Sequence, residues 1–418
     1  MNALIKSAKI IDPKSDFHNQ TVDILIEEGL ITQISNDIKN NKNFKEISFE
    51  NLHVSQGWFD SSVSFGEPGF EERETIDNGL KTAGKSGFTA VALNPSTNPI
   101  IDSNSSISFV KSKASNHATG LYPIGALTAG SKGEDLAELF DMKNAGAVAF
   151  GDYKSPITNP NLVKIALQYV EGFDGLVCSF PFEPKIAGKG VMNENITSTR
   201  LGLKGIPSLS EELHITRDLF ILEYTQGKLH IPTISTAKSV ELIRDAKSKG
   251  LNVSCSVAIH NLVLNDDALT TFDTNFKVLP PLRTEEDRQA LIEGLKDGTI
   301  DMITSDHNPL DVEHKKVEFD NAAYGTIGLE SAFGALNKLF TTKQTIEFLT
   351  KGKNRFGIES HSVQVGNKAE LTLFNPDGKQ TFEKSDILST SKNAIFLNQE
   401  LKGTVYGVFA NNKMELKS

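Results

Sequence analysis

The sequence predicts an α/β protein with a central parallel sheet, closed as a barrel or open and doubly wound, and a small β-module made by both chain ends. Short apolar runs alternate with amphipathic stretches through the centre of the chain, and short alternating strands dominate the two ends. The length of 418 residues suits one large α/β domain with an accessory module.

The N-terminal end is predicted to form three short strands. Residues 3–11 alternate between apolar and polar side chains, as expected of a half-buried strand. Residues 22–34 read VDILIEEGLITQI, where Glu28 and Gly29 join two further strands.

The centre of the chain, after Gly57, is predicted to alternate strands with helices. Its strand-like runs are FTAVALNP, GAVAFGD, DGLVCSF, LHIPTIS, LNVSCSV and DMITSD. Between them, SLSEELHITRDLFILEYTQ and TAKSVELIRDAKSKG carry apolar residues three and four apart, which predicts surface helices of a barrel or of a doubly wound sheet.

The C-terminal end returns to strands near Gly366. AELTLFNPD and GTVYGVFANNKMEL are short β-rich runs punctuated by Asn, Gly and Pro. Because the termini of a domain commonly lie close together, we expect the two ends to pair into a single accessory sheet.

Charge and composition exclude several classes of partner. The formal net charge of -10 leaves no basic field to gather phosphates, so we expect neither nucleic acid nor an anionic membrane as partner. The start has no signal-peptide pattern and no run of eighteen apolar residues occurs, so we expect a cytoplasmic protein. Cys178 and Cys255 lie in no zinc-ligand spacing and are predicted to be buried thiols.

The candidate site lies where the first barrel strand would end. In an α/β barrel the functional groups stand at the carboxyl ends of the strands. The run GWFDSSVSFGEPGFEERET ends such a strand, and its two-residue period places Asp60, Ser62 and Ser64 on one face.

This run begins a resemblance to a known family. FDSSVSFGEPGFEERETIDNGLKTAGKSGFTAV, GLKGIPSLSEELHITRD, DTNFKVLPPLRTEEDRQALIEGLKDGTIDMITSDHNP and YGTIGLESAF match, in order, the dihydroorotases, amidohydrolase-type enzymes of pyrimidine synthesis. The resemblance spans nearly the whole chain. It implies a (β/α)8 TIM-type barrel over residues 56–364 and a composite β-sandwich from residues 1–55 and 365–418.

The resemblance also implies where zinc and substrate would bind. In the family, two histidines after the first strand bind zinc and a following arginine holds the substrate carboxylate; here Ser62, Ser64 and Gly66 stand there. The next three ligand positions fall on Tyr153, Ser179 and Thr233, with Asp152 one place early. A neutral hydroxyl is a poor zinc ligand, so we expect no metal and no other cofactor.

One family acid keeps its place. Asp306 matches the last metal-ligating acid and is followed by His307, which makes these two the residual catalytic candidates. The substrate positions of the family are replaced as well, by Ser96, Leu279 and Leu310. His230 and His260 are expected to be structural, although a slip in register would let His230 act as a displaced ligand.

Three functions follow from these observations. The favoured hypothesis is a pseudoenzyme that acts as a scaffold for aspartate transcarbamoylase. The resemblance implies this role, because some bacterial members of the family lack the zinc ligands and hold aspartate transcarbamoylase in a larger complex. The alternatives are an active cyclic-amide hydrolase that uses Asp306, His307 and Tyr153, and a metabolite sensor whose pocket is lined by serine hydroxyls. We also expect a homo-oligomer.

Overall fold

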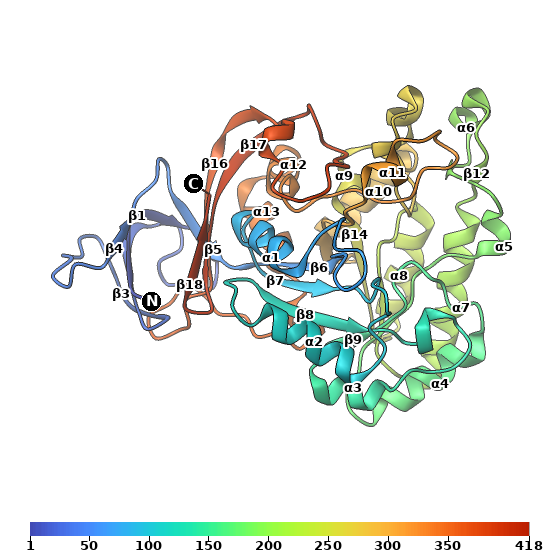
Figure 1. Ribbon diagram of the computed structural model, residues 1–418, viewed down its shortest axis with the longest axis horizontal. Helices are drawn as coiled ribbons and strands as arrows, with labels where there is room; N and C mark the ends of the chain where they lie inside the picture. The colour runs from blue at the N-terminus through green and yellow to red at the C-terminus, as the bar shows by residue number, and fades with distance from the viewer. Residues whose placement is uncertain (418) are drawn as a thin grey trace.

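Both chain ends contribute to one eight-stranded sheet in the computed structural model, which describes residues 1–417 (Figure 1). The strand order is β18-β17-β16-β5-β1-β2-β3, and β4 pairs with β1 on the side of this path. The predicted pairing of the two ends is therefore confirmed. The strands are β1 (Ala3–Ile10), β2 (Thr21–Glu27), β3 (Leu30–Ser35), β4 (Lys45–Ile47), β5 (His53–Gln56), β16 (Leu371–Thr381), β17 (Glu400–Ala410) and β18 (Lys413–Leu416).

The β2–β3 hairpin turns where the sequence predicted it. Glu28 and Gly29 adopt φ values of 51° and 82°, the left-handed conformation that a two-residue hairpin turn needs. Inward-facing side chains such as Ile24, Ile26 and Ile31 are fully buried in a separate apolar cluster. This cluster holds the end sheet together.

The second sheet is a closed parallel barrel. Its eight strands follow the order β15-β14-β13-β10-β9-β8-β7-β6, and a bridge between Val63 and His307 joins the last strand to the first. Closure confirms the barrel and rules out the open, doubly wound sheet. The strands are β6 (Trp58–Val63), β7 (Phe88–Leu93), β8 (Gly120–Gly125), β9 (Ala149–Phe150), β10 (Val177–Cys178), β13 (Leu229–Ile231), β14 (Val253–Ala258) and β15 (Met302–Thr304).

Helices cover the outside of the barrel. Most connect consecutive strands, as in a (β/α)8 fold, and the two predicted from sequence appear as α7 and α8. The longer helices are α1 (Ile76–Lys85), α2 (Asn104–Ala114), α3 (Leu139–Ala145), α4 (Pro160–Glu171), α7 (Leu209–Thr225), α8 (Ala237–Ser248), α10 (Glu285–Lys296), α12 (Ala332–Leu339) and α13 (Thr342–Thr350).

Short elements lie in the loops at the barrel ends. The sequence pattern predicted none of them. They are α5 (Pro184–Ala187), β11 (Met192–Asn193), α6 (Ile196–Leu201), β12 (Gly205–Ile206), α9 (Ile259–Val263) and α11 (Val312–Lys315), with 3-10 turns at Ala129–Ser131, Asp266–Thr271, Thr274–Phe276, Lys353–Phe356 and Lys384–Asp386.

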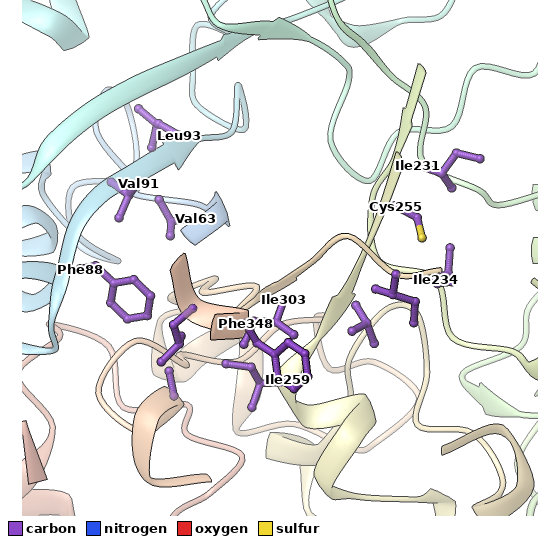
Figure 2. Close-up of a cluster of buried hydrophobic side chains, with 14 of the residues drawn as sticks. Val63, Phe88, Val91, Leu93, Ile231, Ile234, Cys255, Ile259, Ile303 and Phe348 are labelled. Atoms are coloured by element: carbon purple, nitrogen blue, oxygen red, sulfur yellow. The ribbon is translucent and has the colours of Figure 1, made fainter. Parts of the chain in front are cut away.

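The barrel and the end sheet meet around Trp58. Its ring lies 5.0 Å from Phe333 of α12 and 5.7 Å from Phe374 of β16, measured between ring centroids. The main core continues along the barrel, where Figure 2 shows Val63 and Val91 on one side and Ile303 near Phe348 of α13 in the lower centre. The domain boundaries at residues 55 and 365 stay a prediction, although β5 ends at Gln56 and β16 begins at Leu371.

Two smaller expectations concern burial and membranes. Cys178 and Cys255 are buried free thiols, as predicted. Within residues 1–417, every helix is too short or too polar to span a lipid bilayer.

Candidate functional site

The carboxyl ends of the barrel strands converge on a small cavity. Ser62 comes from the end of β6, Tyr153 and Lys154 follow β9, Thr233 follows β13, and Asp306 follows β15. The barrel therefore brings together residues that are far apart in the sequence, at the end where α/β barrels carry their chemistry.

Asp60 fixes the first strand against the last one. Its carboxylate accepts hydrogen bonds from the backbone N–H of Ser62 at 3.1 Å, from the N–H of Ser305 at 3.0 Å and from the hydroxyl of Thr304. Burial raises the pKa of Asp60 to about 6, although these donors oppose the shift. Because its hydrogen bonds go to its own strand and to the end of β15, Asp60 holds the two strands together and does not face the cavity.

Ser62 and Ser64 hydrogen-bond to protein neighbours. The side-chain amide of Asn94 donates to Ser62 Oγ at 3.0 Å and to Ser64 Oγ at 3.2 Å. Ser96 Oγ donates to Ser64 at 3.0 Å, and Ser62 Oγ lies 3.4 Å from Asp306. The two hydroxyls are therefore hydrogen-bonded to other protein side chains.

Lys154 and Asp306 form a buried ion pair at the centre of the cavity. Lys154 Nζ lies 2.7 Å from Asp306 Oδ2, and the side chains are 13% and 2% exposed. The hydroxyl of Tyr153 donates to the other carboxylate oxygen at 3.4 Å. The sequence had indicated Asp306 and Tyr153 but missed Lys154, whose only signal was its place directly after a strand-end position.

The environment keeps this pair ionised. Burial by itself disfavours the charged ammonium, but the carboxylate of Asp306 outweighs it and raises the pKa of Lys154 to about 12. Burial raises the pKa of Asp306 above its ordinary value, and the neighbouring ammonium opposes that shift only in part. Burial and the charge of Asp306 raise the pKa of Tyr153 to about 12, so its phenol stays neutral.

Three strand-end residues have an uncommon backbone conformation. Tyr153, Thr233 and Asp306 have φ values of 52°, 52° and 49°. Left-handed φ is uncommon for residues other than glycine and is an outlier for a β-branched residue such as Thr233. Strain of this kind clusters at functional sites.

Little space is left inside this cluster. The cavity has a volume of about 20 Å³, which is room for roughly one water molecule. Phe180 and Phe356 line its apolar side.

Comparison with known proteins shows the family. Residues 53–239 match the family described as dihydro-orotase-like. The dihydroorotase of Acetivibrio thermocellus is 39% identical over 422 residues, which cover 99% of both chains, and that of Pelotomaculum thermopropionicum is 38% identical over 100% of this chain and 99% of its own. The chain belongs to the dihydroorotase family.

Solved structures of this fold agree with the barrel and its end sheet. An L-hydantoinase (dihydropyrimidinase) from Arthrobacter aurescens superimposes with a TM-score of 0.85 at 21% identity, covering 99% of this chain and 95% of that one. A D-hydantoinase from Thermus sp. gives a TM-score of 0.82 at 18% identity, with 99% and 95% covered. The predicted fold class is therefore confirmed.

The residues that the sequence resemblance predicts at the family's ligand positions do not fit a zinc ion. Ser179 Oγ is turned to Asp218, to which it donates at 2.5 Å, and the backbone N–H of Thr233 is bonded to Ser256. Asp306 is the one carboxylate among the residues predicted at these positions, and it is paired with the ammonium of Lys154. Throughout residues 1–417, no three His, Cys, Asp or Glu side chains gather closely enough to hold a metal. Zinc normally takes three protein ligands in a catalytic site.

Asp152, one place before Tyr153, points away from the cavity. Its carboxylate accepts from the N–H groups of Leu127 and Thr128 at 2.8 and 3.0 Å. It therefore stabilises the loop after β8 and contacts neither Lys154 nor Asp306 through any hydrogen bond described for it.

The positions predicted to contact substrate are also filled by protein. A Cβ atom on Gly66 would lie 1.8 Å from the carbonyl oxygen of Phe70, so this backbone leaves no room for an arginine. Leu279 and Leu310 are 8% and 6% exposed, and Leu279 packs in an apolar cluster with Phe180. An anionic substrate would meet apolar side chains at both leucine positions.

The histidines near the site act as structural groups. His307 Nδ1 accepts from the N–H of Gly328 at 3.2 Å, and His230 Nδ1 lies 2.9 Å from Ser254 Oγ. Burial lowers the pKa of His307 to about 4 and those of His230 and His260 to about 3. His230 reaches the cavity wall, but only Asp306 among the acids lies there with it.

Proposed function

We propose that this dihydroorotase-family protein does not hydrolyse cyclic amides and serves pyrimidine biosynthesis as a scaffold for aspartate transcarbamoylase. The observation that carries the first half is the buried ion pair of Lys154 with Asp306, 2.7 Å apart. An ammonium occupies the one carboxylate that remains at the family's ligand positions.

The chemistry of the cavity supports this proposal. Hydrolysis of a cyclic amide needs a water activated by a metal or by a general base. Lys154 and Tyr153, both with a pKa of about 12, hold their protons near neutral pH. Asp306 is engaged by Lys154, and the Nδ1 of His307 is engaged by Gly328. His230, which also lines the cavity, has a pKa that burial lowers to about 3, so it is a weak base toward water.

The scaffold role rests on what the family resemblance implies. A barrel that keeps its fold while its cavity is filled can still bind a partner through its surface. The acidic net charge of -10 makes a protein partner more compatible than a nucleic acid.

The alternative of an active hydrolase is favoured by one finding, the name dihydroorotase carried by relatives 36–39% identical over nearly the whole chain. The sensor alternative has less support, because a cavity of about 20 Å³ holds roughly one water molecule and no metabolite.

A metal and turnover assay separates these functions. The purified protein, grown and assayed with and without added zinc, is expected to contain far less than stoichiometric zinc and to hydrolyse dihydroorotate no faster than buffer. A zinc-replete dihydroorotase prepared in parallel is the control. The double variant S62H/S64H is expected to stay inactive, because Lys154, Gly66 and the other replacements remain. Strong activity in either protein contradicts the proposal.

The scaffold half needs its own measurement. Co-expressed with the aspartate transcarbamoylase of the same organism, the protein is expected to elute with it as one species, and the zinc-replete dihydroorotase of a distant organism is the control. Separate elution at micromolar concentrations contradicts the scaffold role and leaves the question of hydrolysis to the first assay.

A further inference from the structure

Helix α7 presents an apolar stripe to solvent. Leu209, Leu213, Phe220 and Tyr224 are 53%, 47%, 69% and 74% exposed. A surface helix normally turns its apolar side inward, and α7 already does so with Ile215, Leu219 and Leu222. The outward stripe is therefore a second apolar face that the barrel does not use.

The stripe lies on α7 alone. The neighbouring helix α4 packs against α7, but its exposed Tyr169 packs on Phe173, which contacts Phe140 of α3. In Figure 1 both helices lie on the flank of the barrel remote from the end sheet. With roughly 150–250 Å² of surface for each aromatic side chain, the exposed apolar area is on the order of 500 Å². Patches of this size on a monomer commonly mark an interaction site.

The stripe is symmetric along the helix. Its four members are spaced by four, seven and four residues, so Leu209 mirrors Tyr224 and Leu213 mirrors Phe220 about a point between Thr216 and Arg217. A two-fold axis at that point, perpendicular to the helix, would place each residue of one copy against its mirror residue in the other. This self-complementarity is what an isologous dimer requires.

We propose that α7 is the dimer interface of this protein, packed antiparallel against α7 of a second copy. Leu213 of each copy then contacts Phe220 of the other, and Leu209 contacts Tyr224. The order of 500 Å² of apolar area, extended by polar side chains at the rim, approaches the roughly 800 Å² per partner of a standard interface. The dimer forms whether the barrel hydrolyses a substrate or not.

Charge at the axis is compatible with this arrangement. The two Arg217 side chains would approach each other there, since each lies one position from the centre. Each guanidinium is held by its own Asp218 at 2.7 Å, with His214 as a further contact at 2.8 Å. Two internally neutral ion pairs therefore meet at the axis.

The mirror relation gives a sharp test by sedimentation equilibrium. The wild-type protein is expected to be a dimer at micromolar concentration. The variants L213E and F220K each place a charge against an apolar residue and should weaken the dimer on the order of 100-fold or more. The double variant L213E/F220K should restore it, because each glutamate then faces a lysine of the other copy.

A matched control and a second measurement complete the test. F109E changes an exposed aromatic residue on α2, 41% exposed, and should leave the dimer unchanged. T216C is expected to cross-link to its own copy through a short bifunctional maleimide, because position 216 lies next to the axis. A monomeric wild type, a dimer insensitive to L213E and F220K, or no rescue in the double variant overturns the proposal. Binding of aspartate transcarbamoylase that is lost in L213E while the protein itself is monomeric would assign α7 to that partner instead.

Discussion

At the residue scale, Lys154 and Asp306 depend on each other. Both are buried, and each would be a desolvated, unpaired charge without its partner. The variants K154M and D306L are therefore each expected to lower the free energy of unfolding by about 3–5 kcal/mol, while K154M/D306L stays near the wild type because it replaces the pair by apolar groups. Urea unfolding measures all four proteins.

The exposed pair of Lys81 with Asp77, side chains 47% and 63% exposed, is the control for this cycle. K81M should change the stability little, since surface ion pairs are screened by water. Additive losses in the K154M/D306L double variant would contradict the coupling.

The sequence could indicate the positions of the site but not how they are filled. Aligned positions named Ser62, Tyr153 and Asp306, and all three line the same cavity. Lys154 was missed because no family pattern marks it and strand alternation cannot say which way a side chain points after the left-handed Tyr153. The Cβ clash at Gly66 depends on the fold of residues 66–70 and is invisible to any local pattern.

At the element scale, the segment after β15 is sensitive to acid through His307. Burial lowers the pKa of this imidazole to about 4, below the value of 6.5 expected in the unfolded chain. Unfolding therefore takes up a proton between these values. The stabilising contribution is fully present above pH 6.5 and is lost as the pH falls toward 4, by about 3 kcal/mol.

The variant H307N isolates this contribution. Asparagine can still accept the hydrogen bond from Gly328 but does not titrate. Its unfolding free energy, measured by urea titration from pH 4 to 7, should fall less steeply with decreasing pH than that of the wild type. The difference in slope should correspond to about one proton fewer taken up on unfolding. Equal slopes in the two proteins would show that His307 does not titrate on unfolding.

Elements with a strong period were predictable and short ones were not. The three- and four-residue spacing in α7 and α8 gave both helices close to their observed bounds. The insertion with α5 and α6 has no periodicity, since elements of four and six residues are held by capping and tertiary contacts. Counting apolar residues in α7 also could not separate its buried face from its exposed stripe.

At the scale of the whole molecule, Trp58 reports on both domains at once. The single tryptophan packs between Phe333 of the barrel and Phe374 of the end sheet. Its fluorescence and the far-UV circular dichroism should therefore change at the same urea concentration. F374A should lower both midpoints together, because it leaves a cavity that costs about 3–5 kcal/mol.

F49A, in the loop between β4 and β5 and stacked on Tyr406 of β17, is the control and should shift the midpoints far less. An early fluorescence change with intact barrel ellipticity would contradict this prediction, since it would mean that the end sheet opens alone.

The pairing of the two chain ends was predictable in outline because both are β-rich and termini lie close together. Its register was not. Leu371 pairs with Gln56 and Phe374 with His53, and neither segment shows a pattern that selects these partners over a slip of two residues. Such long-range pairing is set by the barrel that holds the two ends in place.

That pairing has a consequence for synthesis on the ribosome. β5 is complete at Gln56, but its partner β16 starts only at Leu371. At roughly 5–20 residues per second, the nascent chain carries an unpaired strand edge for about 15 s to 1 min. Exposed edges recruit other strands. Newly made chains that wait in this state are the form of the protein most in need of a chaperone.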